Sequence, residues 1–413
     1  MTPLSRGELE DIRYELLADD IDIDYERMKS WTRKQAEQFF ESGGINAPDG
    51  DDRSRAPGRT SWPSAADLRD GNAHDLLANA LGVLPPVDTQ GPSMPGEARG
   101  QQSASKTFVP KPTARVRLFL LYGVADVCMS LEKWIRAAPE WLEVRLLDLP
   151  GHGFRSKEAL PACANSLSAA DTFDEAHLAR QREALIEQLS DEIKTAGAGS
   201  KPYALYGFSF GALVMYGIGL RLSAEGCPPL ALCVAGRGGP HFSYLSRASC
   251  ELVAKTDAEA MLQWQSGGGN FQTDNIPTHM RDRAAQLFRC GMLLGAQPAG
   301  SGQLHLPLRQ GGNACQSSAG MMDEVEWMEG APKLPKGCRV VAVGSTADLV
   351  WPDDGVERWA DVAFEPRDFV GKTVDGVEHL KLMNDEVTMR TCFAEVGVQA
   401  MDLAASAQEE HKG

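Results

Sequence analysis

The chain lacks the long apolar runs of a membrane protein and the positive charge of a nucleic-acid-binding protein. No stretch of its 413 residues approaches the roughly 18 to 20 apolar residues that span a bilayer, and residues 1–14 lack the apolar core of a signal peptide. The chain has 41 Lys and Arg and 57 Asp and Glu, which gives a net charge of -16. This charge disfavours a nucleic-acid partner, because phosphates are bound mainly by Lys and Arg. We therefore expect a cytoplasmic protein without a transmembrane segment.

The sequence also lacks the cysteine spacing of a disulfide framework or a zinc site. Its nine cysteines are odd in number and scattered, with no Cys-x-x-Cys pair and no Cys/His group at zinc spacing. Hydrophobic residues make up 43% and charged residues 24% of the chain, as in an ordinary globular protein. We expect buried, reduced thiols, no metal and no cofactor.

Composition divides the chain into a head, a linker and a larger body. Residues 1–45 are predicted to form a helical appendage, either a docking module or a helix packed on the body, which ends at Gly43-Gly44. Residues 46–111 are rich in Pro, Gly, Ser and Asp, and this predicts a flexible, mostly disordered linker with one short helix at about 65–84. Residues 401–413 are predicted to be a polar tail.

The body, residues 112–400, alternates short apolar runs with helical patterns. Strands are predicted at 116–121, 144–147, 203–206, 230–234, 340–343 and 362–364, and helices at 177–195 and 210–224. Such alternation is typical of an α/β fold with a mostly parallel sheet and helices on both faces. Between about residues 245 and 333 the pattern becomes helical and Gly-rich, which predicts an insertion in the place of a lid over an active site.

One motif in the body has the spacing of a catalytic serine motif. Gly207-Phe208-Ser209-Phe210-Gly211 has Gly-x-Ser-x-Gly spacing, which chance alone produces about 0.3 times in a chain of this length. Its setting is more specific than its spacing, because a predicted strand precedes it and an apolar helix follows it. A nucleophile elbow needs this strand-turn-helix, in which a strained turn lifts the serine hydroxyl above the sheet. We predict Ser209 to be a nucleophile, against a chance Gly-rich turn.

A serine nucleophile needs a histidine base, which comes last in chain order in this type of fold. His379 lies in a predicted loop after the strand expected at 362–364, whereas His411 lies in the polar tail. His379 is therefore the predicted base. His152 and His241 lie in loops that would face the same rim and are interpreted as neighbours of the site.

The acid that orients the base should follow an earlier strand. Asp348 comes directly after the strand predicted at 340–343, and Asp353 and Asp354 on the same loop compete with it. An oxyanion hole needs two backbone N–H groups, one from the residue after the nucleophile and one from the loop after an early strand. Phe210 and Gly123 are the candidates.

Several of these segments, in this order, resemble the type II thioesterases that accompany polyketide, nonribosomal peptide and fatty acid synthases. The resemblance extends over residues 117–385, and its segments are Leu118–Gly123, Leu149–Gly151, Tyr203–Leu213, Ala235–His241, Gly344–Asp348 and Gly376–His379. It implies an α/β-hydrolase fold with a helical lid, a triad of Ser209, Asp348 and His379, and an oxyanion hole at Gly123 and Phe210. The chain departs from the family at Phe208, usually His, and at Val124-Ala125, usually Gly-Gly.

The resemblance implies hydrolysis of an acyl thioester through an acyl-enzyme intermediate. The substrate would be an acyl group on the phosphopantetheine arm of an acyl carrier protein or synthase, as in fatty acid or polyketide biosynthesis and lipid metabolism. Two alternatives remain at this point. The same triad serves an esterase, a lipase or an acyltransferase on oxygen esters, and the fold also occurs in binding modules without activity.

Overall fold

The computed structural model describes most of residues 105–410. Outside the described part lie residues 1–104, 107–108, 125, 169–170, 199, 241, 244, 246, 268–279, 297–303, 307–324, 328–330, 349, 352 and 411–413. The predicted head, the helix at 65–84 and most of the linker therefore lie outside the described residues, as do His241 and His411. None of the described helices is long and apolar enough to cross a membrane.

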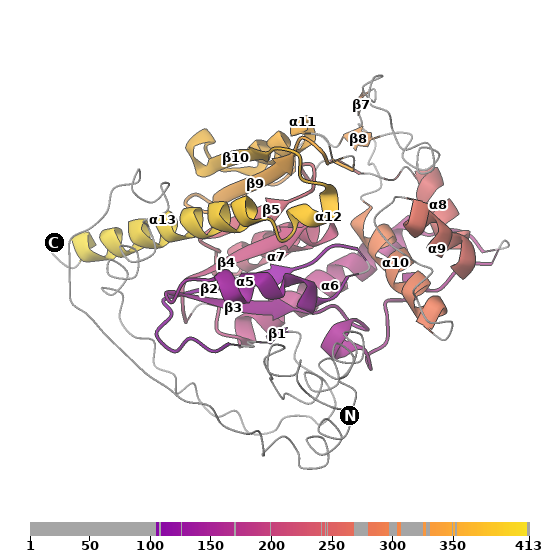
Figure 1. The fold of residues 1–413 in the computed structure, drawn as a ribbon, viewed down its shortest axis with the longest axis horizontal. Helices are drawn as coiled ribbons and strands as arrows, with labels where there is room; N and C mark the ends of the chain where they lie inside the picture. Colours follow the sequence, from indigo (N-terminus) through magenta and orange to yellow (C-terminus); the bar gives the residue numbers. More distant parts are fainter. Residues whose placement is uncertain are drawn as a thin grey trace, which may run out of the picture. The chain divides into compact units, whose positions relative to one another are not determined.

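A seven-stranded sheet organises the fold (Figure 1). Its strands, in spatial order, are β1 (Ser105–Lys106), β3 (Leu142–Leu147), β2 (Val116–Leu121), β4 (Tyr203–Phe208), β5 (Ala231–Ala235), β9 (Arg339–Ser345) and β10 (Phe369–Val374). Strand β1 pairs antiparallel with β3, and every other pairing is parallel. The predicted α/β-hydrolase fold with a mostly parallel sheet is confirmed.

The central strands could be predicted from the sequence because they are buried. Every residue of β4 and β5 is buried, so these strands appear as continuous apolar runs. The helices are α5 (Glu132–Ala137), α6 (Glu175–Thr195), α7 (Phe210–Ala224), α11 (Asp353–Glu357), α12 (His379–Leu382) and α13 (Glu386–Glu410). Figure 1 shows α5 and α13 on one face of the sheet and α6 and α7 on the other.

The predicted insertion between β5 and β9 is helical. It comprises α8 (Arg247–Lys255), α9 (Ala258–Gly267) and α10 (Arg281–Gly295), beside a small sheet of β6 (Phe242–Ser243), β8 (Val325–Trp327) and β7 (Leu304–Leu306). The buried Arg289 of α10 donates to the carbonyls of Val253 and Thr256 at the end of α8, and to that of Ala164 in the body. One side chain thus ties the insertion together and to the body.

The strand predicted at 362–364 is wrong. A 3-10 helix occupies Arg358–Val362, and the strand of this region is β10. Strand β10 forms the edge of the sheet, and its central residues, Gly371, Lys372 and Thr373, are exposed. An edge strand with solvent-facing residues has no continuous apolar run, so the apolar residues just before it gave a misleading signal.

Two predicted boundaries also differ from the structure. Helix α13 continues to Glu410, so most of the expected polar tail is helical. Ser105 and Lys106, at the end of the expected linker, pair with Leu147 and Leu146 of β3. Neither segment has an apolar pattern of its own, because one is the outer end of a long helix and the other is a two-residue edge strand.

Candidate active site

Ser209 occupies the turn between β4 and α7 in a strained conformation. Its φ is 50° and its ψ is -114°, and among the described residues it is the single non-glycine residue with a positive φ. Its backbone N–H donates to the carbonyl of Ala235 on the neighbouring strand β5, at 2.9 Å. Strain of this kind persists only where the surroundings enforce it, and it is the mark of a nucleophile elbow.

The two glycines of the motif are required by close backbone contacts. A Cβ on Gly207 would lie 2.4 Å from the carbonyl oxygen of Gly211, and one on Gly211 would lie 2.4 Å from that of Tyr122. Real Cβ atoms do not approach backbone oxygens so closely, so only glycine lets α7 pack against β4 and the end of β2. The spacing of the motif thus follows from the packing of the turn.

The structure brings the three predicted triad residues together. Asp348 follows the end of β9, and its Oδ2 lies 2.7 Å from Nδ1 of His379, the first residue of α12. Nε2 of His379 lies 3.3 Å from Oγ of Ser209. Asp348 and His379 are 6% and 8% exposed, so little water competes for these contacts.

The carboxylate of Asp348 is itself held in place. Its Oδ1 accepts the backbone N–H groups of Val350, at 2.8 Å, and Trp351, at 2.9 Å, which leaves Oδ2 facing the imidazole. A carboxylate at Nδ1 favours the tautomer whose Nε2 accepts a proton from the hydroxyl. The competing Asp353 and Asp354 are the first residues of α11.

Two polar residues that the sequence reasoning missed join the acid loop to the histidine loop. The buried Ser345 donates its hydroxyl to the carbonyl of Val377 and accepts the N–H of Val377 at 3.2 Å. Thr346 donates to Oδ1 of Asp375 at 2.7 Å. The available signal was their position, since Ser345 ends a buried strand, Thr346 follows it, and both come shortly before the candidate acid.

Phe208 forms the wall behind His379. Its ring centroid lies 5.0 Å from that of the imidazole, and the side chain is almost completely buried. Glycines flank the ring on both sides: a Cβ on Gly236 would lie 2.6 Å from Cε2, and one on Gly123 would lie 3.0 Å from Cδ1. At this position the chain therefore places an apolar ring, with no titratable group, against the imidazole.

The two predicted oxyanion residues lie next to the nucleophile. A Cβ on Gly123 would lie 3.4 Å from Cβ of Ser209. Phe210 begins α7, so its N–H is one of the first four that a helix leaves without an acceptor of its own. Val124 packs against α10, because a Cβ on Gly291 would lie 2.9 Å from its Cγ1. The insertion thus touches the loop that carries Gly123.

His152 lies on a neighbouring loop. It is buried, and its Nδ1 lies 3.1 Å from the carbonyl oxygen of Pro150. Burial lowers the pKa of His152 to about 4, so the imidazole is neutral near pH 7. Its ring packs against Tyr122, the residue before Gly123. The structure therefore gives His152 a packing position beside the predicted oxyanion loop.

Comparisons with known proteins support the same interpretation. Residues 158–263 match the family model of the thioesterase domain. The medium-chain S-acyl fatty acid synthase thioesterase of Anas platyrhynchos is 27% identical over 135 residues, which cover 32% of this chain and 46% of that protein. The predicted resemblance to thioesterases is confirmed.

The same likeness extends to a solved structure at the level of the fold. The type II thioesterase BorB from the borrelidin biosynthetic cluster superimposes with a TM-score of 0.50 at 18% identity, over 72% of this chain and 99% of BorB. The chain spans about half the length of its curated thioesterase relative. The match to the thioesterase model includes Ser209 and Phe210 but ends before Asp348 and His379, so it says nothing of these two residues, which the structure places beside Ser209.

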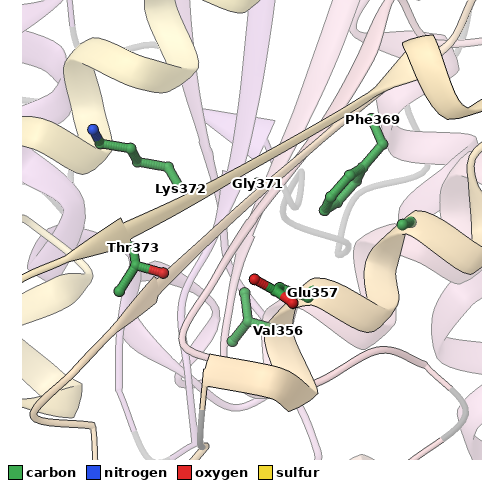
Figure 2. Close-up of a pocket in the computed structure, with 7 residues that line it drawn as sticks. Val356, Glu357, Phe369, Gly371, Lys372 and Thr373 are labelled. Atoms are coloured by element: carbon green, nitrogen blue, oxygen red, sulfur yellow. The ribbon is translucent and has the colours of Figure 1, made fainter.

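A surface hollow lies on the edge of this thioesterase-like fold. It has a volume of about 390 Å³, and β10 lines it together with α11 and the 3-10 helix that follows. Figure 2 shows Phe369 and Thr373 on the side of β10 that faces Val356 and Glu357, whereas Lys372 points to the other side. None of the three triad candidates lines it, so this hollow is separate from the candidate active site.

Proposed function

We propose that this chain hydrolyses acyl thioesters through an acyl-enzyme intermediate on Ser209. The observation that carries the proposal is the continuous contact from Oγ of Ser209 through the imidazole of His379 to the carboxylate of Asp348. His379 takes the hydroxyl proton as Ser209 attacks the carbonyl carbon, and Asp348 stabilises the imidazolium that forms. Asp353 and Asp354 have no role in this mechanism.

The N–H groups of Gly123 and Phe210 hold the oxygen of the tetrahedral intermediate. When this intermediate collapses, the C–S bond breaks and the thiol leaves with the proton that His379 carries. A water molecule, deprotonated by His379, then attacks the carbonyl carbon of the acyl-Ser209 ester. The bond between this carbon and Oγ of Ser209 breaks, His379 returns the proton to Oγ, and the carboxylic acid is released. A thiol with a pKa of about 8 to 9 is a good leaving group, so its departure needs little help from protonated His379 as a general acid.

The substrate that we propose is an acyl group on the phosphopantetheine arm of an acyl carrier protein or synthase. The name of the curated relative, an S-acyl fatty acid synthase thioesterase, supports this choice. The helices α8, α9 and α10 form the lid above the acyl group, within a catalytic body at 112–400 that follows an appendage and a linker. The enzyme acts in the cytoplasm without a nucleic-acid partner or a cofactor.

The test compares Ser209→Ala with Ser223→Ala on one acyl group, presented as a thioester and as an oxygen ester. Ser223 lies in α7, the helix that follows Ser209, and its hydroxyl donates to the carbonyl of Gly219. We expect Ser209→Ala to lower the rate of acid release by about four orders of magnitude, and Ser223→Ala to leave it unchanged. Equal rates for Ser209→Ala and the unmodified chain would refute the proposal, and a preference for the oxygen ester would indicate an esterase.

A further inference from the structure

We propose that Arg237 is a positioning residue that couples the position of helix α10 to the orientation of the Asp348 carboxylate. This inference rests on the proposed role of Asp348 as the acid of the triad. Arg237 follows β5, is 1% exposed and is not one of the three triad candidates. Its contacts instead connect the insertion with the loop that carries the acid.

The first contact is with the end of α10. Nη2 of Arg237 donates to the carbonyl of Gly295, the last residue of that helix, at 3.0 Å. The last four carbonyls of a helix receive no hydrogen bond from an N–H group of the same helix. A cation at this end also offsets the negative end of the helix dipole. Arg237 therefore stabilises α10 in the position where Gly291 packs against Val124.

The second contact is with the acid loop. The guanidinium carbon of Arg237 lies 4.9 Å from the centroid of the Trp351 ring, a cation–π arrangement in a buried setting. The backbone N–H of Trp351 donates to Oδ1 of Asp348 at 2.9 Å. A shift of the indole therefore moves one of the two N–H groups that orient the carboxylate.

The backbone around Arg237 leaves little room for such a shift. A Cβ on Gly238 would lie 2.7 Å from the Trp351 ring, and one on Gly236 would lie 3.1 Å from Cε1 of His379. The carbonyl of Arg237 accepts the indole N–H of Trp359 at 2.8 Å. The segment thus touches the histidine on one side and the acid loop on the other, so Arg237 is held in a defined place between them.

Arg182 provides a matched control. It lies on α6, and it donates to the carbonyls of Leu294 and Ala296, on either side of the Gly295 carbonyl that Arg237 binds. Both arginines therefore hold the same end of α10. Arg237 in addition stacks on the ring of Trp351, so the two variants separate a structural role at α10 from an effect on the acid.

The experiment compares Arg237→Lys and Arg182→Lys in the full-length chain. Lysine keeps the positive charge and loses the planar stacking surface. Steady-state kinetics on an acyl thioester gives kcat and KM, and proton NMR follows the downfield resonance of the proton shared by His379 Nδ1 and Asp348. Thermal unfolding reports whether each variant is folded. Trp351→Leu is a second variant, which keeps the backbone N–H and removes the stacking ring.

We expect Arg237→Lys and Trp351→Leu to lower kcat by about 3- to 30-fold with little change in KM, and to move or broaden the shared-proton resonance. Arg182→Lys should leave both unchanged, whatever its effect on the unfolding temperature. Equal effects of the two arginine variants, or an unmoved resonance in Arg237→Lys and Trp351→Leu, would overturn the inference. The resonance needs no turnover, so an unmodified chain that shows it and hydrolyses no thioester would contradict the proposed function alone.

Discussion

The strained turn at Ser209 depends on neighbouring glycines, whose lack of a side chain leaves room for close contacts. Gly207 and Gly211 leave space that backbone oxygens fill, and Gly123 and Gly236 do the same for the ring of Phe208. The serine motif could be found in the sequence because its spacing is a consequence of this packing. The contacts of Phe208 and Ser345 could not, because their partners are distant in the sequence, such as His379 for Phe208 and Val377 for Ser345.

Gly211 and Gly219 lie 8 positions apart in the same helix, and we expect their substitution by alanine to affect stability to very different extents. A Cβ at Gly211 meets backbone oxygens at 2.4 and 2.6 Å, whereas one at Gly219 meets movable side chains at 3.3 Å and beyond. We expect Gly211→Ala to destabilise the fold by at least about 2 kcal/mol, and Gly219→Ala to change stability by less than about 1 kcal/mol. Urea unfolding of both variants measures this, and a tolerated Gly211→Ala would contradict the described turn.

His152 should make the fold less stable in mild acid. Its pKa of about 4 in the folded chain lies below the ordinary 6.5, so the folded state binds the proton more weakly than the unfolded state does. The stability that this provides is complete above pH 6.5 and is lost as the pH falls toward 4. We expect the free energy of unfolding of His152→Gln to fall by up to about 3 kcal/mol less than that of the unmodified chain over this pH range.

Urea unfolding between pH 4 and pH 7 measures the effect of His152→Gln. The buried Asp148, whose pKa burial raises to about 6, contributes in the opposite sense over the same range, so only the difference between the variant and the unmodified chain at each pH is informative. Parallel stability curves for the two proteins would show that His152 is not the buried, neutral group described here.

At the scale of elements, buried strands were predictable and exposed ones were not. Strands β4 and β5 are apolar throughout, and β2 and β9 carry apolar runs at Leu118–Leu121 and Val340–Val343, because both faces of the sheet are covered there. Strand β10 has a solvent-exposed centre, and its sequence resembles a loop. The candidate acid and base could still be placed, because loops after parallel strands meet at one edge of a sheet whether or not the last strand is recognised.

Ser345 should stabilise the junction between β9 and the loop before α12. Its buried hydroxyl bonds both backbone groups of Val377, which Ser345→Ala would leave without a partner. Ser190 is equally buried, but its hydroxyl bonds the carbonyl of Ile186 within its own helix. We expect Ser345→Ala to cost about 1 to 3 kcal/mol and to lower kcat, and Ser190→Ala to cost less than about 1 kcal/mol without a change in kcat.

Thermal unfolding and steady-state kinetics of these two variants separate a local from a general effect. Loss of kcat in Ser345→Ala alone would support a role for the hydroxyl in aligning Asp348 with His379. Equal kcat values in both variants would mean that the two loops keep their alignment without it, since both substitutions remove one buried hydroxyl.

At the scale of the whole molecule, all seven strands and the three triad candidates lie within residues 105–410. A shortened chain of residues 105–413 should therefore fold and hydrolyse a small free thioester at the rate of the full chain. If the appendage at residues 1–45 docks a carrier protein, the shortened chain should lose turnover of carrier-bound substrate only. Equal loss on both substrates would show that the first 104 residues are needed for the catalytic body itself.

The central claim is that Ser209 carries the acyl group during turnover. The direct test mixes the protein with an acyl thioester, stops the reaction with acid within milliseconds to seconds, and weighs the peptide that contains Ser209 by mass spectrometry. The account predicts that this peptide gains the mass of the acyl group as the thiol is released, and loses it as the acid appears. Release of the acid without any acylated Ser209 peptide, or at an unchanged rate in Ser209→Ala, would contradict it.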